Sequence, residues 1–204
     1  MADINITEAL TTKLVHDTIG NVGALSNALE LIEEDENQID EAVKGILVAS
    51  TNALKSRLKF FRMAFGINNK ENFADINVVK ENCLAYLKTV EIKQYPFMVD
   101  FNISEVSMFK ALCCSLMILA DVAYKGANIK VDMDQNKLEI KLVAEVLSAD
   151  KLQTICDIFN DKNEIINAQT AVAMFLKCLV KQQNVQMSFN ATEKQMNFGF
   201  YRNV

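Results

Sequence analysis

Apolar residues recur at helical spacing through the first third of the chain. Between residues 6 and 34, and again between residues 39 and 65, they return every three to four positions, which predicts two long amphipathic helices. The acidic segment EEDENQ at 33–38 separates the helices, and Gly66 is the expected stop of the second. A hairpin of two helices cannot bury its own apolar stripe, so we expect another surface to cover it. The two stripes comprise Leu10, Leu14, Ile19, Val22, Leu25, Leu29 and Ile32, then Val43, Ile46, Leu47, Leu54, Leu58 and Phe61.

Beyond a polar linker at 67–77, helical and strand patterns alternate. The expected elements are helices at 78–90, 104–126, 151–160 and 168–183, a strand at 95–103, and β-hairpins at 128–147 and 185–202. Ser104 is the expected N-cap of the buried helix at 104–126, and Gly126 is its expected stop. The pattern predicts an α+β protein in which a sheet carries helices on one face. We divide it into a helical hairpin at 1–68 and an α/β sandwich at 69–204.

Composition narrows the class of protein. The chain has 204 residues, of which 50% are hydrophobic and 23% charged, as in a folded globular protein. Its net charge of −5 argues against nucleic-acid binding, because phosphates require a basic face. The N-terminal segment MADINITEAL lacks the features of a secretory signal, and the longest apolar run, at 111–120, is too short to span a bilayer. We therefore expect a cytoplasmic protein with no nucleic-acid or membrane partner.

The five cysteines form no CxxC pair, and the sole histidine is far from all of them in the chain. Such spacing predicts neither a zinc site nor a disulfide framework, so we interpret the cysteines as reduced, buried side chains. They are Cys83, Cys113, Cys114, Cys156 and Cys178.

His16 is the sole histidine, and a helical wheel places it nearly opposite the centre of the apolar stripe. We therefore expect its imidazole to be exposed. Two glycines on its face each cost about 1 kcal/mol in a helix, which indicates that this face leaves room for a close approach. Close packing of another helix there is the alternative. The residues of this face are Ala9, Thr12, Gly20, Gly23 and Asn27.

Asp17 follows His16 directly. A neighbouring carboxylate can hold one imidazole nitrogen as N–H and leave the other free as a nucleophile or base. The sequence offers no recognisable triad around this pair, so acyl-transfer hydrolysis has little support. His16 and Asp17 are therefore the candidate catalytic residues, suited to an incoming protein or phosphoryl group.

The segment LVHDTIGNVGALSNALELIEE at 14–34 resembles the H-box helix of the dimerisation and histidine-phosphotransfer domain of two-component signalling proteins. More closely, it resembles the ChpT-type histidine phosphotransferases, in which an HD pair is followed by GA and a GLELL-like segment. FFRMAFG at 60–66 is similar to the end of that family's hairpin, and the order of the later elements is similar to its degenerate ATPase-like domain. This sequence departs from the family at Asn21, where a proline is frequent, and at Gly20, which replaces a polar residue.

The resemblance implies a homodimer in which two hairpins form a four-helix bundle. It implies that His16 takes a phosphoryl group from an aspartyl phosphate on one receiver domain and passes it to another. The implied partners are response-regulator receivers and the receiver of a hybrid sensor kinase. Magnesium is expected on the receiver, and no cofactor is expected on this chain.

Basic residues predict where a partner docks. Lys44, Lys55, Lys59 and Arg62 share one exposed flank of the second helix and could face an acidic receiver pocket, although a solvated face is the alternative. Arg57 is expected near the height of His16, where it could pair with Asp17. The predicted partner-binding residues are Lys13, Gly20, Gly23, Asn27, Lys55, Arg57, Lys59 and Arg62.

Glycine is scarce in the second half of the chain. Beyond Gly66 only Gly126 and Gly199 remain, too far apart for any glycine-rich nucleotide loop. We therefore expect a support or docking surface in the α/β part, and a phosphotransferase that is not an ATP-dependent kinase. A non-catalytic dimeric signalling adaptor or scaffold is the alternative. A small-molecule enzyme that uses the cysteines is not supported, because the sequence offers no set of catalytic partner residues for them.

Overall fold

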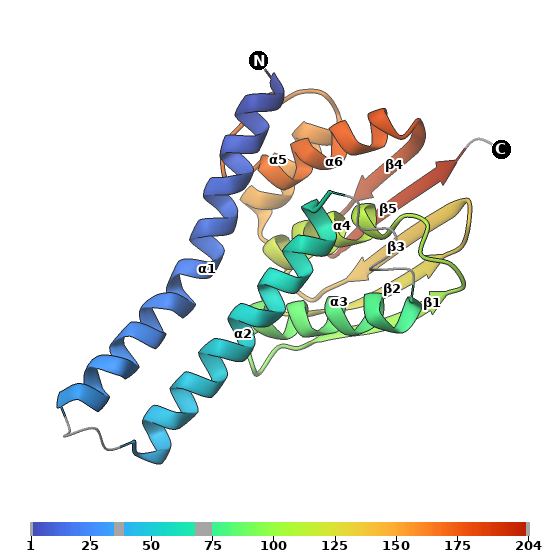
Figure 1. Ribbon diagram of the computed structural model, residues 1–204. Helices are drawn as coiled ribbons and strands as arrows, with labels where there is room; N and C mark the ends of the chain where they lie inside the picture. Colours follow the sequence, from blue (N-terminus) through green and yellow to red (C-terminus); the bar gives the residue numbers. More distant parts are fainter. Residues whose placement is uncertain (1, 35–38, 68–74, 203–204) are drawn as a thin grey trace.

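Two antiparallel helices project from a layered α/β body in the computed structural model, which describes residues 2–34, 39–67 and 75–202 (Figure 1). They are α1 (Ala2–Glu34) and α2 (Glu41–Phe65), so the predicted hairpin is confirmed. The first helix begins at Ala2 rather than at residue 6. Most of the predicted acidic turn and of the predicted linker lies outside the described residues.

Local sequence determines both ends of α2. The Asp40 carboxylate accepts a hydrogen bond from the backbone N–H of Val43 at 2.7 Å, which caps the first turn. At the other end the N–H of Gly66 donates to the carbonyl of Arg62 at 3.0 Å. Gly66 is therefore the helix stop that the sequence predicts.

The remaining elements form the α/β body. They are α3 (Ile76–Val90), β1 (Phe97–Ile103), α4 (Phe109–Val122), β2 (Ala127–Met133), β3 (Lys137–Val143), α5 (Ala149–Phe159), α6 (Ala171–Gln182), β4 (Val185–Ala191) and β5 (Gln195–Arg202). The strands pair in the order β1-β2-β3-β5-β4. β1 and β2 are parallel because α4 crosses between them, and the other pairs are antiparallel.

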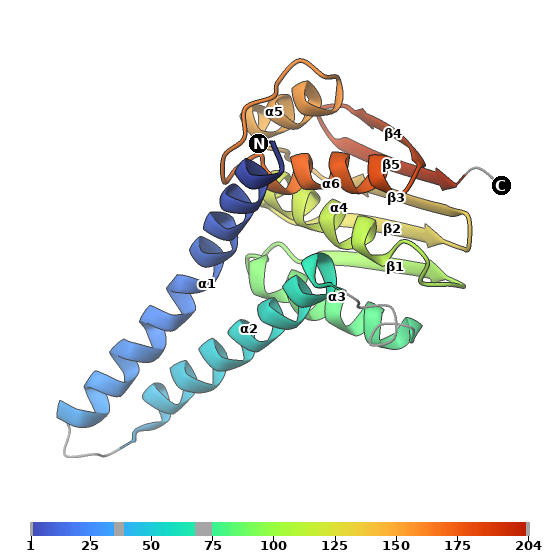
Figure 2. The same cartoon turned by 45° about the horizontal axis from the view of Figure 1, so that its top comes forward.

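One face of the sheet is the core. Alternate residues of β2 and β3 are buried, and in their antiparallel register Ile129 lies opposite Leu142 and Val131 opposite Ile140. Helices α3, α4, α5 and α6 lie on this face, as Figure 2 shows. The predicted α+β fold, with helices on one side of the sheet, is confirmed.

The root of the hairpin is part of the same core. Ile6 and Leu10 of α1 are buried where that helix meets α6. On α2, Phe60 and Met63 are fully buried, and the Phe60 ring stacks on Tyr86 of α3 with centroids 4.0 Å apart. The predicted domain boundary at residue 68 therefore crosses a packed interface, and it stays a prediction.

The bounds of α4 differ from the prediction. Met108 occupies the N-cap position, whereas Ser104 donates its backbone N–H to the Met133 carbonyl at 2.9 Å and starts no helix. The helix ends at Val122, before Gly126. Gly126 instead has a left-handed φ of 73°, in the turn that leads into β2. The prediction of both caps was wrong because Ser104 pairs with the last residue of β2, and Gly126 supplies the positive φ of the turn that follows the helix.

Gly126→Ala should lower the free energy of unfolding by about 2 kcal/mol or more, because the position needs a positive φ. A Cβ there would also lie 2.5 Å from the backbone oxygens of Tyr95 and Pro96. Urea denaturation measures the change. The matched control is Gly45→Ala on α2, where a Cβ meets nothing within 4 Å. That substitution should raise stability by about 0.5–1 kcal/mol, and a Gly126 variant as stable as wild type would contradict the strained turn.

Burial predicts which cysteines react. Cys83, Cys113 and Cys114 are buried, whereas Cys156 and Cys178 are half-buried. Burial raises the pKa of the Cys114 thiol to about 12 and that of Cys113 well above its ordinary value. Because the thiolate is the reactive form, iodoacetamide at pH 8 should modify only the two half-buried cysteines in the folded protein. Cys156 should react slowly, since partial burial and the neighbouring Asp157 raise the pKa of its thiol as well. Intact-mass spectrometry would count the adducts, and all five cysteines should react in urea.

Candidate functional site

The imidazole of His16 projects from the middle of α1 with 83% of its side chain exposed. The expectation of an exposed histidine is confirmed. Outside its chain neighbours and the backbone of α1 itself, a Cβ built on Gly20 or Gly23 meets nothing within 4 Å among the described residues, so they pack no helix against this face. Asn27 is exposed on the same face, whereas Ala9 is buried at the root of the hairpin.

Asp17 places a carboxylate beside the ring. Its Oδ1 lies 3.5 Å from Nδ1 of His16. A carboxylate at this position favours the tautomer that carries the proton on Nδ1, which leaves the lone pair of Nε2 free and directed away from the carboxylate. The side chain of Asp17 is only 18% exposed, so it lies on the side of α1 that faces the rest of the chain, next to the exposed His16.

Lys13 connects this pair to the α/β body. Its Nζ lies 3.0 Å from Oδ2 of Asp17 and 3.2 Å from Oδ2 of Asp121, near the end of α4. Burial opposes the charge of Lys13, but the two carboxylates more than offset it, and the pKa of Lys13 lies above its ordinary value. Lys13 is among the predicted partner-binding residues, yet its ammonium group is engaged within the chain.

Arg57 of α2 contacts the same turn of α1. Its guanidinium donates to the main-chain carbonyl of Asp17, and to the carbonyl and hydroxyl oxygens of Thr89 on α3 at 2.8 and 3.1 Å. The predicted pairing of Arg57 with Asp17 is thus found at the main-chain oxygen and not at the carboxylate, which Lys13 already occupies. Like Lys13, Arg57 is used inside the chain rather than on a free surface.

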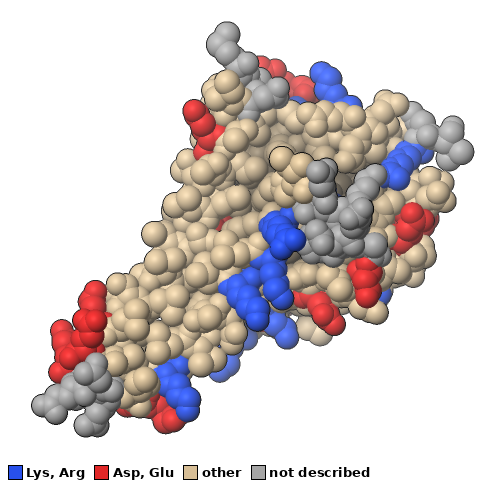
Figure 3. All heavy atoms as spheres, in the orientation of Figure 1, with Lys and Arg blue, Asp and Glu red and all other residues tan. Residues whose placement is uncertain are grey.

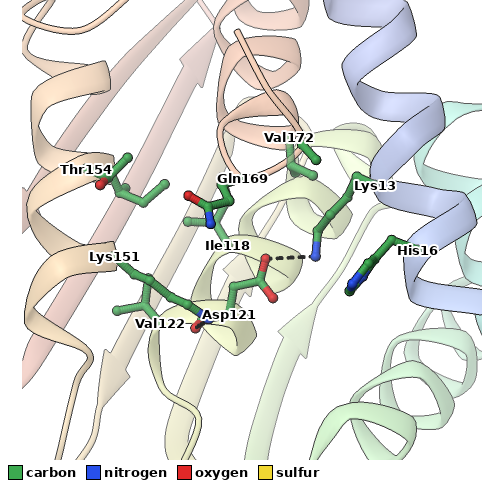
Figure 4. Close-up of a pocket in the computed structure, with 11 residues that line it drawn as sticks. Lys13, His16, Ile118, Asp121, Val122, Lys151, Thr154, Gln169 and Val172 are labelled. Atoms are coloured by element: carbon green, nitrogen blue, oxygen red, sulfur yellow. Dashed lines mark hydrogen bonds and ion pairs between the residues drawn. The ribbon is translucent and has the colours of Figure 1, made fainter. Parts of the chain in front are cut away.

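A pocket of about 320 Å³ lies beside His16, between α1 and the α/β body. Figure 4 shows Lys13 and His16 extending from α1 toward Asp121, with the Lys13–Asp121 ion pair at the pocket wall. The other lining residues include the apolar Ile118, Val122 and Val172 and the polar Lys151, Thr154 and Gln169. The exposed imidazole is therefore bordered by a hollow surface of the α/β body.

A basic surface follows α2. Lys55, Lys59 and Arg62 are exposed, as is Lys44 nearer the tip of the hairpin. Figure 3 shows basic side chains gathered along this helix. Their role in partner binding stays a prediction, as does that of Gly20, Gly23 and Asn27.

Sequence reasoning missed Asp121, because this residue lies within the helix at 104–126 that the pattern predicts to be buried. Asp121 is the one charged residue of the segment at 112–123. An isolated carboxylate at the end of an apolar helix is a usable signal, since a charge beside a core requires a partner. Nothing in the sequence indicates that Thr89 accepts hydrogen bonds from Arg57.

Two further properties concern the described residues as a whole. Nowhere in them do three His, Cys, Asp or Glu side chains gather as a metal ion would require. In the same ranges, no helix has both the length and the apolar character needed to cross a bilayer.

Part of the chain is similar in sequence to a known phosphotransferase. No family model matches the chain. A protein phosphotransferase ChpT of Brucella abortus (strain 2308) is 35% identical over 66 residues, which is 32% of this chain and 31% of that protein. Over these residues the chain is similar to a ChpT phosphotransferase. The match covers about a third of the relative's length, so the activity of the whole relative does not follow from it.

Solved structures extend the likeness to the whole fold. A structure described as a bacterial phosphotransferase superposes with a TM-score of 0.76 at 19% identity, covering 97% of this chain and 96% of that one. The histidine kinase AdeS of Acinetobacter baumannii gives a TM-score of 0.44 at 12% identity, over 91% of this chain and 95% of that one. The first match establishes that this chain shares the fold of that phosphotransferase along nearly its full length.

Proposed function

We propose that this chain is a ChpT-type histidine phosphotransferase that carries a phosphoryl group between receiver-domain aspartates in a two-component phosphorelay. The observation that carries the proposal is the environment of His16, an imidazole that is exposed on an open helix face while the carboxylate beside it is anchored. The name of the Brucella relative supports the reaction class. The structural likeness supports a common framework for the site.

The proposed transfer requires little of this chain beyond its imidazole. Nε2 of His16 attacks the phosphorus of the aspartyl phosphate, so an N–P bond forms while the P–O bond to the aspartate breaks. The electron pair of that bond remains on the departing carboxylate. Asp17 holds the Nδ1 proton and offsets the positive charge that develops on the ring. The magnesium ion that shields the phosphoryl oxygens would be held by the receiver, so the chain supplies nucleophile and orientation.

Two surfaces would complete the assembly. We propose that the exposed basic residues Lys55, Lys59 and Arg62 face the acidic pocket of a receiver, including that of a hybrid sensor kinase. Complementary charge of this kind steers association. We further propose a homodimer that acts in the cytoplasm, in which the hairpins of two chains form a four-helix bundle.

The test uses a receiver domain from the same cell, phosphorylated on its aspartate. Incubation with the chain should yield phosphate that is labile in acid and stable in base, as expected of phosphohistidine. Transfer from the labelled chain to a second, unphosphorylated receiver should then follow. If no receiver of the cell donates phosphate, the proposal fails and a non-catalytic adaptor becomes the better description.

A further inference from the structure

We propose that Lys13 and Asp121 are positioning residues for transfer at His16, so that the α/β body orients the phosphoryl acceptor through a single ion-paired lysine. The inference rests on the proposed function, since it assigns a role within that same site. It gives the α/β body a part in the chemistry of His16, in addition to any part it has in docking.

The ammonium group of Lys13 lies between carboxylates from two different elements. It is 3.0 Å from Asp17 on its own helix and 3.2 Å from Asp121 on α4. The side chain of Lys13 is only 15% exposed and that of Asp17 18%, whereas that of Asp121 is 43% exposed. By contrast, the Lys44–Glu41 pair on α2 is exposed on both sides, and such pairs contribute little. The Lys13–Asp17 pair is therefore the kind that holds side chains in one geometry, and Asp121 joins it from α4 at the edge of the pocket.

Asp121 supplies a fixed point for this lysine. It lies in the last turn of α4, a helix whose residues are buried on nearly every side. Lys151 donates to the main-chain carbonyl of Asp121 at 3.0 Å, so two lysines gather at the C-terminal end of α4, where the helix dipole favours positive charge. Without the Asp121 carboxylate, Lys13 would keep only its pairing with Asp17 on its own helix, and its link to α4 would be lost, so the lysine side chain would regain part of its rotamer freedom.

Lys13 affects His16 by restraining the carboxylate of Asp17. Lys13 contacts both oxygens of that carboxylate, with Oδ1 at 3.2 Å, and Oδ1 is also the atom 3.5 Å from Nδ1 of the imidazole. Fixing Asp17 keeps the proton on Nδ1 and the lone pair on Nε2. The main-chain bond from Arg57 restrains the same residue. The acceptor is thereby held against the α/β body, and Lys13 is the link that touches the carboxylate.

The single histidine of the chain provides a direct readout. Nitrogen-15 shifts of its imidazole report which ring nitrogen carries the proton, without any receiver present. The variants are Lys13→Met, Asp121→Asn and Lys13→Arg. The matched control is Lys151→Met, which removes an ammonium from the same pocket, one that bonds to the main chain of Asp121 rather than to its carboxylate. Thermal unfolding checks that each variant folds.

Lys13→Met should shift the tautomer away from Nδ1–H and slow transfer at saturating phosphorylated receiver by about tenfold or more, because misplaced reacting groups lose orientation. The receiver concentration at half-saturation should stay within about twofold, since no docking contact is removed. Asp121→Asn should move both readouts in the same direction. Lys13→Arg should restore them, and Lys151→Met should leave them as in wild type.

Wild-type shifts and rates in both Lys13→Met and Asp121→Asn would overturn the inference, as would an equal loss in Lys151→Met. If Lys13→Met does not fold, Asp121→Asn decides, because it keeps the size and shape of the side chain. If the imidazole responds as expected but wild type accepts no phosphate from any receiver, the proposed function fails while the positioning of His16 by Lys13 stands.

Discussion

Replacing His16 with glutamine should leave the chain unable to accept phosphate from a phosphorylated receiver, while its fold is retained. The imidazole is the proposed nucleophile, so no other group replaces it at this position. The side chain is 83% exposed and its replacement is polar, so stability should change by no more than about 0.5 kcal/mol. Labelling with radioactive phosphate measures the first effect, and thermal unfolding measures the second.

A second variant tests whether exposure alone is enough. The double substitution Thr12→His with His16→Gln moves the imidazole one turn along the same exposed face. There it has no aspartate after it in the chain, because residue 13 is Lys13. We expect this variant to accept no phosphate.

Asp17→Asn should instead slow transfer by about 10²-fold or more without abolishing it, because it removes the carboxylate that orients the imidazole and leaves the nucleophile in place.

The outcomes separate the two functions that the sequence leaves open. Label that persists in His16→Gln would place the acceptor elsewhere, and His16 would not be the nucleophile. Label that persists in the Thr12→His double variant would show that any exposed imidazole on this face suffices, and Asp17 would lose its role. Absence of label in wild type with every receiver of the cell would favour the adaptor.

Much of the fold follows from periodicity. The hairpin and the exposure of His16 could be predicted because a helix of 3.6 residues per turn separates its apolar stripe from the opposite face. Gly66 could be predicted as a stop because glycine after basic residues is a local signal. The bounds of α4 could not, because the segments on either side of it are held by contacts with residues that are distant in sequence. Ser104, for example, pairs with Met133.

In the candidate site, too, local features could be predicted and contacts between distant segments could not. His16 and Asp17 are neighbours in the chain, so their pairing is visible in the sequence. The contact of Lys13 with Asp121 depends on where α1 lies beside the α/β body, in which it packs against α6, and no periodic pattern encodes it. Arg57 shows an intermediate case, since hairpin register places it beside Asp17 but does not choose between the carboxylate and the carbonyl. The local chemistry of the site is thus predictable, and its anchoring to the α/β body is not.

We expect the chain to form a dimer with about twice its mass of 22.9 kDa in light scattering at micromolar concentration. Four apolar side chains of α1 recur at the spacing of a helical seam, and each is between 46% and 57% exposed. They are Val15, Ile19, Val22 and Leu29. Burying these in two copies contributes on the order of 5–10 kcal/mol, which is comparable to the cost of association.

Val22→Glu with Leu29→Glu should therefore give a folded monomer, because two carboxylates would have to be buried in the seam of each chain. The matched control is Val143→Glu, which charges a similarly exposed apolar side chain at the end of β3. That variant should keep the dimer mass, since Val143 lies on the face of the sheet that the helices leave open. A clean monomer for wild type would contradict the four-helix bundle, because the apolar seam of α1 would then face water in the functional protein. The His16 site would still stand in that case, because every contact that anchors it lies within one chain.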